Sequence, residues 1–357
     1  MKILFLSSRE LSYPRNDVLL RALTRLGTVD TIGYPVRGSL VLRSLQVLRR
    51  ALPRLLRRDH DLVVVAFYGH FLMLAVGLVA RAPILFDAFV STFDTLSQDR
   101  KRFRPESWPG RLSFWLDQTA CRLADHVLLD TPAHVKYFVD VFGLPQEKFS
   151  ALPVGCNEAI FSSQAAYPSG QPGRPVRVLH YSSFLPLHGT DVIVRAAALL
   201  QDKPIVFRLI GEGQQYAQVR QLALQLGLQN VQLLPSVPLE QLPAELAAAD
   251  ICLGGHFGAS EKAGRVVPGK IYQMLAMGKP VIAADTQANR QFLTHNQDAY
   301  LCSPNEPEAL AAALSHLQSD AALRSRLGCA GKSLYEQTCS EQKIGEQIEK
   351  IVRELVA

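Results

Sequence analysis

The stretch Arg265–Gly278 reads RVVPGKIYQMLAMG and is followed by the apolar run Pro280–Ala284, PVIAA. Proline suits the first turn of a helix, so Pro268 predicts a helix over Lys270–Met277. A short, wholly apolar run after a helix is typical of a buried parallel strand. The stretch therefore predicts a loop–helix–strand unit of an α/β domain.

The predicted helix start has the chemistry of an anion site. A helix N-terminus carries about half a positive charge and unpaired N–H groups, which attract phosphate. Arg265 and Lys270 add formal charge there, and Gln273 lies one turn beyond Lys270 on the same face. We therefore expect this unit to hold a phosphorylated ligand.

The rest of the chain repeats this alternation twice. We expect an N-terminal domain over 1–160, a Ser/Gly/Pro-rich linker over 161–175 and a second domain over 176–340. An amphipathic helix over 341–357 either packs on the second domain or braces the first. The fold class is thus α/β, with two Rossmann-like, doubly wound domains facing across a cleft. Strands are expected at 2–6, 62–66, 84–86, 126–130, 149–154, 176–181, 205–210, 231–234, 251–253 and 281–284.

Composition and charge exclude several classes of protein. The apolar content of 48% and the charged fraction of 20% are those of an ordinary globular protein. Six scattered cysteines without a C-x-x-C pair indicate reduced thiols in a cytosolic protein. The sequence contains no run of about 18 apolar residues, so we expect no membrane-spanning helix. The net charge of +6 lies in residues 1–165, which hold 21 basic and 15 acidic residues. Nucleic acid, an anionic membrane or a phosphorylated substrate would each suit this asymmetry.

A second strand–loop–helix unit opens the second domain. After the expected strand come Ser183, His188 and Gly189, and the glycine permits close backbone approach. His188 beside exposed N–H groups suits a diphosphate, whereas a capped turn with a surface histidine is the alternative. Further on, RLIGEG places Gly211 at the end of a strand, where it either forms a turn or brings backbone to a ligand.

This order of motifs resembles the donor-binding half of retaining glycosyltransferase family 4, the glycosyl transferases group 1 of the GT-B fold. The resemblance covers about 110 residues, from the H-G loop through RLIGEG and LAAADI to VPGKIYQMLAMGKPVIA. It implies a nucleotide-diphosphate sugar as donor, retention of anomeric configuration, no cofactor and no metal. UDP- and GDP-sugars are the donors expected. The D-x-D at Asp59–Asp61 precedes a first-domain strand, and we interpret it as a solvated turn.

Several positions depart from the family pattern. The acids of its E-x7-E motif fall on Arg265 and Gln273, and its basic pair falls on Ser183 and His188. Some branches carry K-A-x-R-V-x-P-x-K instead, which Lys262, Arg265 and Lys270 match. We expect Gln273 to bind the ribose and the basic residues to hold the diphosphate.

The first domain supplies weaker candidates. Arg15 and Asn16, in the loop after the first strand, are expected to contact donor phosphates, with a surface turn as the alternative. The histidine that the family often has after the Ile84–Phe86 strand is absent, and Asp87 stands at one of the matching positions. Asp87, His188, Arg265 and Lys270 are the predicted catalytic residues. The predicted acceptor-site residues are His70, Ser91 and Asp94. Of these, His70 is expected to end a strand and to point toward the cleft.

Residues 40–58 read LVLRSLQVLRRALPRLLRR, with six arginines and no acid. Leucines at helical spacing make this a basic amphipathic helix, which suits a membrane interface or a solvated cover for the sheet. The segment Lys101–Arg104 with Trp108 and Trp115 adds basic and aromatic groups. The basic helix lacks the interleaved aromatics of a nucleic-acid site.

These features predict a metal-independent hexosyltransferase, cytoplasmic and peripheral at the inner face of the plasma membrane. Its acceptor would be a glycan or lipid-linked precursor of the cell envelope or of an exopolysaccharide. The alternatives are an inactive GT-B binding subunit of a glycan-assembly complex and a GT-B epimerase. Donor turnover separates an enzyme from an inactive subunit.

Overall fold

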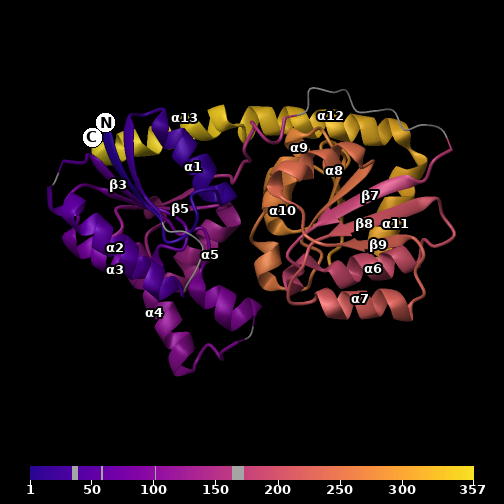
Figure 1. Ribbon diagram of the computed structural model, residues 1–357, viewed down its shortest axis with the longest axis horizontal. Coiled ribbons are helices and arrows are strands. Elements are labelled where there is room, and N and C mark those ends of the chain that lie inside the picture. Colours follow the sequence, from indigo (N-terminus) through magenta and orange to yellow (C-terminus); the bar gives the residue numbers. More distant parts are fainter. Residues whose placement is uncertain (34–38, 58, 101, 163–172) are drawn as a thin grey trace. The chain divides into compact units, whose positions relative to one another are not determined.

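Two compact units make up the computed structural model of the chain (Figure 1). The first unit comprises Met1–Asn157 and Cys339–Ala357, and the second comprises Glu158–Thr338. Arg58, Lys101 and most of the predicted linker over 161–175 lie outside the described residues. The structure describes residues 1–33, 39–57, 59–100, 102–162 and 173–357.

The first unit is built on a parallel six-stranded sheet of order β2-β1-β3-β4-β5-β6. Its inner strands are apolar and almost wholly buried, because helices cover both faces of such a sheet, whereas the edge strands β2 and β6 are only partly buried. The chain reverses direction across the sheet between β1 and β3, which is the switch point at which ligands of open α/β sheets bind. The strands are β1 (Lys2–Leu6), β2 (Thr28–Ile32), β3 (Leu62–Val65), β4 (Ile84–Asp87), β5 (His126–Leu129) and β6 (Phe149–Ala151).

Helices on the two faces of this sheet bury two separate apolar cores. One core lies under α2, α3, α4 and α5, and the other lies under α1 and the C-terminal helix α13. The helices are α1 (Pro14–Thr24), α2 (Leu40–Arg57), α3 (His70–Val79), α4 (Trp108–Leu123), α5 (Pro132–Phe142) and α13 (Glu341–Val356).

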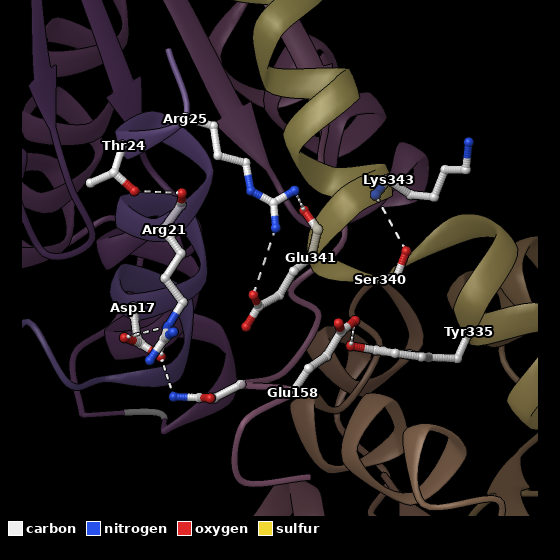
Figure 2. A network of polar contacts seen from close by, with 10 residues as sticks. Asp17, Arg21, Thr24, Arg25, Glu158, Tyr335, Ser340, Glu341 and Lys343 are labelled. Atoms are coloured by element: carbon white, nitrogen blue, oxygen red, sulfur yellow. Dashed lines mark hydrogen bonds and ion pairs between the residues drawn. The ribbon is translucent and has the colours of Figure 1, made fainter. Parts of the chain in front are cut away.

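Helix α13 packs on α1, and the two ends of the chain lie together on this unit (Figure 1). Ile344, Ile348 and Val352 are fully buried in the core that α1 shares. At the start of α13, the Arg25 guanidinium donates to the Glu341 carbonyl oxygen at 3.3 Å and lies 3.9 Å from its carboxylate (Figure 2). The Ser340 hydroxyl accepts from the Lys343 N–H and caps the helix. The chain's last helix is therefore part of the first unit.

The second unit has a parallel sheet of order β12-β11-β10-β7-β8-β9. This is the order of a dinucleotide-binding sheet, with its switch point between β7 and β10. The loops that follow β7 and β10 therefore emerge side by side. The strands are β7 (Val176–Tyr181), β8 (Ile205–Ile210), β9 (Val231–Leu234), β10 (Ile251–Gly255), β11 (Val281–Ala284) and β12 (Tyr300–Cys302).

Helices cover both faces of the second sheet as well. Helix α6 packs against α7 and α11, whereas α8 and α9 lie on the opposite face, where α12 packs against α9 (Figure 1). The helices are α6 (Thr190–Ala198), α7 (Tyr216–Gln225), α8 (Leu242–Ala248), α9 (Gly269–Ala276), α10 (Gln287–Phe292), α11 (Pro307–Ser319) and α12 (Ala321–Thr338).

The fold class predicted from sequence, two doubly wound α/β units, is confirmed. The sequence did not predict β2, α3, α5, α10, β12 or α12. Helix α3 reads HFLMLAVGLV, which is apolar on every side and so has no helical period to recognise. The edge strand β2 reads TVDTI, which lacks the continuous apolar run of a buried strand.

Candidate functional site

The loops after β7 and β10 of the second unit are in backbone contact. Gly189 has φ of +63°, and a Cβ there would lie 2.4 Å from the carbonyl carbon of Phe257. A Cβ on Gly258 would lie 2.2 Å from the Pro186 carbonyl oxygen. Only glycine permits this approach on both sides, so the two loops form one continuous wall at the switch point.

The RLIGEG turn is pressed against the same wall. Gly211 and Gly213 have φ of +138° and +147°. A Cβ on Gly211 would lie 1.8 Å from the Ser182 carbonyl oxygen, and one on Gly213 would lie 1.9 Å from that of Ser183. The turn therefore supports the loop that carries the exposed Ser183 side chain. The structure places this turn in contact with the neighbouring loop, and the approach of its backbone to a ligand stays a prediction.

Four basic side chains from different elements lie together at the carboxyl ends of β7 and β10. They are His180 at the end of β7, His188 before α6, His256 after β10, and Lys270 in the first turn of α9. The His188 and His256 rings are stacked with centroids 5.4 Å apart. The Lys270 ammonium lies 5.9 Å from the centroid of the Tyr181 ring. Among the described residues, its buried Nζ atom has no hydrogen-bond partner.

Hydrogen bonds define the protonation of two of these imidazoles. His180 Nδ1 donates to the Leu253 carbonyl at 3.0 Å, because a carbonyl can only accept. His188 Nδ1 accepts from the Leu185 N–H at 3.2 Å, so its proton is on Nε2 when the ring is neutral. His188 can therefore cap its own loop with one nitrogen and offer a donor with the other.

The four basic groups repel one another when charged. Burial lowers the pKa of His180, His188 and His256, and the Lys270 ammonium lowers it further. Burial also lowers the pKa of Lys270 to about 7. In the described part of the chain, no carboxylate is among the groups that shift these pKa values. An anion that entered would raise these pKa values, because it stabilises the charged forms of the four groups.

The remaining predicted donor-site residues lie around this cluster. Lys262 is 9% exposed, in the turn Glu261–Gly264. Arg265 lies 3.5 Å from the exposed Glu261 carboxylate. Gln273 is buried, and its Oε1 accepts from the Tyr181 hydroxyl at 2.6 Å. The Gln273 amide nitrogen remains as a possible donor to a ligand.

In the first unit, two of the predicted residues are each other's partner. Arg15 and Asp87 are 1% and 0% exposed, and the guanidinium Nη2 lies 2.8 Å from the carboxylate. Arg15 also donates to the carbonyl oxygens of Leu152 and Pro153 at 2.7 and 3.0 Å. Burial raises the pKa of the Asp87 carboxyl, and the Arg15 charge opposes this. Asn16 is buried too, and it donates to the Ser7 hydroxyl and the Glu10 carbonyl.

Two of the acceptor-site candidates, Ser91 and His70, lie beside Asp117, a carboxylate that the sequence did not single out. The Ser91 hydroxyl donates to Asp117 at 2.7 Å and accepts from the Asp94 N–H at 2.9 Å. His70 Nε2 lies 3.6 Å from the other oxygen of Asp117. The predicted position of His70 at a strand end is wrong: β3 ends at Val65, and His70 is the buried first residue of α3.

Sequence reasoning missed His180, Tyr181 and His256 in the second unit, and Asp117 and the buried pair of Asp130 with His134 in the first. A usable signal for His256 was GGHFG directly after an apolar strand. Asp130 and His134 are four residues apart at the start of α5, whereas the other pairings join residues from separate elements and leave no local pattern.

A metal site needs several ligating side chains at one point. Within the described ranges, no three His, Cys, Asp or Glu side chains are grouped so that they could hold a metal ion. Asp59 forms an ion pair with Lys2 at the surface, and Asp61 accepts from the Lys2 backbone N–H at 2.7 Å. The D-x-D segment therefore contacts the first residue of β1.

Residues 166–334 match the family model described as glycosyl transferases group 1. The amylovoran biosynthesis glycosyltransferase AmsK of Erwinia amylovora is 25% identical over 178 residues, 49% of this chain. The D-inositol 3-phosphate glycosyltransferase of Acidothermus cellulolyticus is 28% identical over 220 residues, 57% of this chain. The chain spans 43% and 48% of the length of these two relatives.

A solved structure shares the whole fold. The crystal structure of Anabaena Alr3699/HepE in complex with UDP and glucose has a TM-score of 0.75 and 19% sequence identity. The similarity covers 99% of this chain and 100% of that one. Residues 166–334 are thus a domain of the glycosyl transferases group 1 family, within a chain that has the GT-B fold.

Proposed function

We propose that this protein is a retaining glycosyltransferase that moves a hexose from a UDP- or GDP-sugar to a hydroxyl group of a glycan or lipid-linked acceptor. The observation that carries the proposal is the cluster of His180, His188, His256 and Lys270 at the switch point of the second unit. Such a cluster gains stability only when an anion enters, and a nucleotide diphosphate supplies that charge. The AmsK relative, named for amylovoran biosynthesis, supports a polysaccharide precursor as acceptor.

The donor is held by groups of the second unit in this proposal. Lys270, Arg265, Lys262 and His188 contact the diphosphate, and the peptide N–H groups at the start of α9 add to them. The Gln273 amide binds the ribose while its oxygen stays with Tyr181. Stabilising the negative charge that develops on the departing diphosphate is the largest catalytic contribution.

Fixed cations take the place of a metal ion in this mechanism. Lys270 and Arg265 offer the positive charge that a divalent ion would otherwise bring to the diphosphate. The acceptor proton passes to the donor phosphate, and the sugar keeps its anomeric configuration. The proposal therefore expects transfer that proceeds unchanged in excess EDTA, with the product configuration read by nuclear magnetic resonance.

The acceptor binds to the first unit in this proposal. Ser91 and His70 lie beside Asp117, Asp94 donates its N–H to Ser91, and Asp87 is paired with Arg15. These groups position a hydroxyl and stabilise a positively charged sugar. Replacing Ser91 by Ala should then raise the KM for acceptor and leave the Kd for UDP unchanged.

We also propose that the protein is cytoplasmic and binds the inner face of the plasma membrane through α2. Helix α2 buries Ser44, Val47, Ala51 and Leu55 against the sheet. Its outer face mixes arginines with exposed leucines, including Leu42 at 57% and Leu56 at 61% exposure. None of the described helices is long and apolar enough to span a bilayer. Exposed large apolar groups on α2 and α4 are Val41, Leu42, Leu45, Leu52, Leu56, Trp108, Leu112 and Trp115.

Vesicle sedimentation tests the membrane proposal. Replacing Arg49, Arg50 and Arg57 by Gln should weaken binding to phosphatidylglycerol vesicles, because each basic group near an anionic surface contributes about 1 kcal/mol. Replacing the exposed Arg220 and Arg326 of the second unit by Gln is the matched control. Equal sedimentation of the two variants would exclude α2 as the contact.

Donor turnover tests the proposed activity directly. Calorimetry with UDP and GDP identifies the base, and release of that nucleotide from its common sugars, with and without polyprenyl-phosphate-linked acceptors, identifies the reaction. A second function is favoured by one observation, namely that Arg265 and Gln273 stand where the family has two glutamates. An inactive GT-B binding subunit would bind the nucleotide and its sugars without release under any condition.

A further inference from the structure

His256 lies in the GGHFG loop that follows β10, and neither the family pattern nor the sequence motifs assigned it a role. Its side chain is 7% exposed, although the residue belongs to a loop at the open edge of the sheet. Among the described residues, its buried Nδ1 atom has no hydrogen-bond partner. A buried polar atom without a partner is costly, which suggests that its partner is a ligand.

Among the described residues, the groups that shift the pKa of His256, stack on its ring or are shifted by it come from several elements around the switch point, and all are basic. His180 belongs to β7, the stacked His188 belongs to the loop before α6, Lys270 belongs to α9, and Lys262 belongs to the turn before it. The acid of that turn, Glu261, has a side chain that is 84% exposed and pairs with Arg265. A ring of buried bases around an unpaired nitrogen is complementary to a multivalent anion.

We propose that His256 is a further diphosphate-binding residue of the second unit, and that it takes up a proton from solvent when the ligand enters. This inference rests on the proposed function and adds proton coupling to it. In the empty site the imidazole is neutral; with the anion present, its protonated ring donates to a phosphate oxygen. The bond formed is a charge-assisted hydrogen bond, and the ring keeps its stacking on His188.

The direction of the pH effect follows from the empty site. Burial and the charges of Lys270 and Lys262 lower the pKa of His256 below its usual value. An anion beside the ring raises that pKa, so ligand affinity increases as pH falls toward 6.5. At pH 8.5 the ring is deprotonated with or without ligand, and this contribution disappears.

Calorimetric titration with UDP at pH 6.5 and 8.5, in buffers of different ionisation enthalpy, measures proton uptake and Kd together. The wild type should take up about half a proton or more per UDP beyond His256→Asn at pH 6.5. The variant should bind UDP about tenfold more weakly there, and the difference should shrink at pH 8.5. Protonation of UDP itself cancels between the two proteins. His316→Asn, an exposed histidine of the same unit, is the matched control.

Each other outcome contradicts a defined part of the inference. Equal Kd and equal proton uptake in wild type and variant overturn the role of His256. An affinity loss of the same size at both pH values overturns the proton uptake. If His256→Asn does not fold, judged by circular dichroism, His256→Gln takes its place. If the wild type binds neither UDP nor GDP, the proposed function fails and this inference fails with it.

Discussion

The first unit contains buried basic groups that each lie against a carboxylate, whereas the second unit contains a cluster in which basic groups lie against one another. In the first unit Arg15 lies 2.8 Å from Asp87, and His134 lies 2.6 Å from Asp130. In the second unit Lys270 and three imidazoles share one edge of the sheet without a carboxylate among the described groups that shift their pKa values. Removing one partner of a buried ion pair is destabilising, and a cluster of groups with strongly shifted pKa values is a candidate ligand site.

The largest effect is expected from breaking the Arg15–Asp87 pair. Arg15→Met leaves a buried carboxylate without its partner, which should destabilise the first unit by about 3–5 kcal/mol. Both tryptophans, Trp108 and Trp115, lie in α4, so tryptophan fluorescence in a urea titration reports the first unit alone. Arg21→Met is the control in the same helix. Its pair with Asp17 is exposed and should contribute less than about 1 kcal/mol.

The matching change in the second unit should weaken binding and should not lower stability. Lys270→Met removes an ammonium that has no hydrogen-bond partner among the described residues, so folding loses nothing. UDP binding should weaken by about a hundredfold, because a charge-assisted contact to phosphate is lost. Lys279→Met should behave in the opposite way. The Lys279 ammonium donates to the carbonyl oxygens of Ala247 and Ala249, so this change lowers stability and spares affinity.

The pH dependence of stability sharpens the comparison further. Burial lowers the pKa of Lys270 to about 7 in the folded protein, while an unfolded lysine titrates near about 10.4. Between these values the unfolded chain binds more protons, so stability rises with pH. The wild type should gain more than about 1 kcal/mol relative to Lys270→Met between pH 7 and pH 9.5. Scanning calorimetry of the second unit's transition measures this, and parallel pH profiles would contradict it.

The smallest effect is expected at Gln273. Glutamate at this position still accepts from the Tyr181 hydroxyl, and it is the residue that the family pattern has there. Gln273→Glu should therefore keep donor turnover within about threefold, because one hydrogen-bond acceptor replaces another. Gln273→Leu should lose about 1 kcal/mol of stability because Tyr181 loses its acceptor. Loss of folding in the glutamate variant would mark Gln273 as a packing residue.

Local patterns predicted much of the fold and part of the candidate site. Runs such as KILFL and VIAA predict buried strands, and PGK predicts the start of α9. The helix begins at Gly269, one residue before the predicted start. The loop at Ser183–Gly189 was also predicted from strand–loop–helix order. The pairing of Arg15 with Asp87 was not, because the sequence showed two separate polar residues in two loops.

The chain's apolar periodicity and its turn residues were enough to establish two doubly wound α/β units and to indicate the family of the second. These signals act over a few residues, so they can be recognised in the printed sequence. The tertiary structure alone decided which polar groups meet. Arg15 and Asp87 are 72 residues apart, and Tyr181 and Gln273 are 92 apart. Parallel strands bring such distant residues to the same end of the sheet. The order of the strands then determines which polar groups lie close enough to pair.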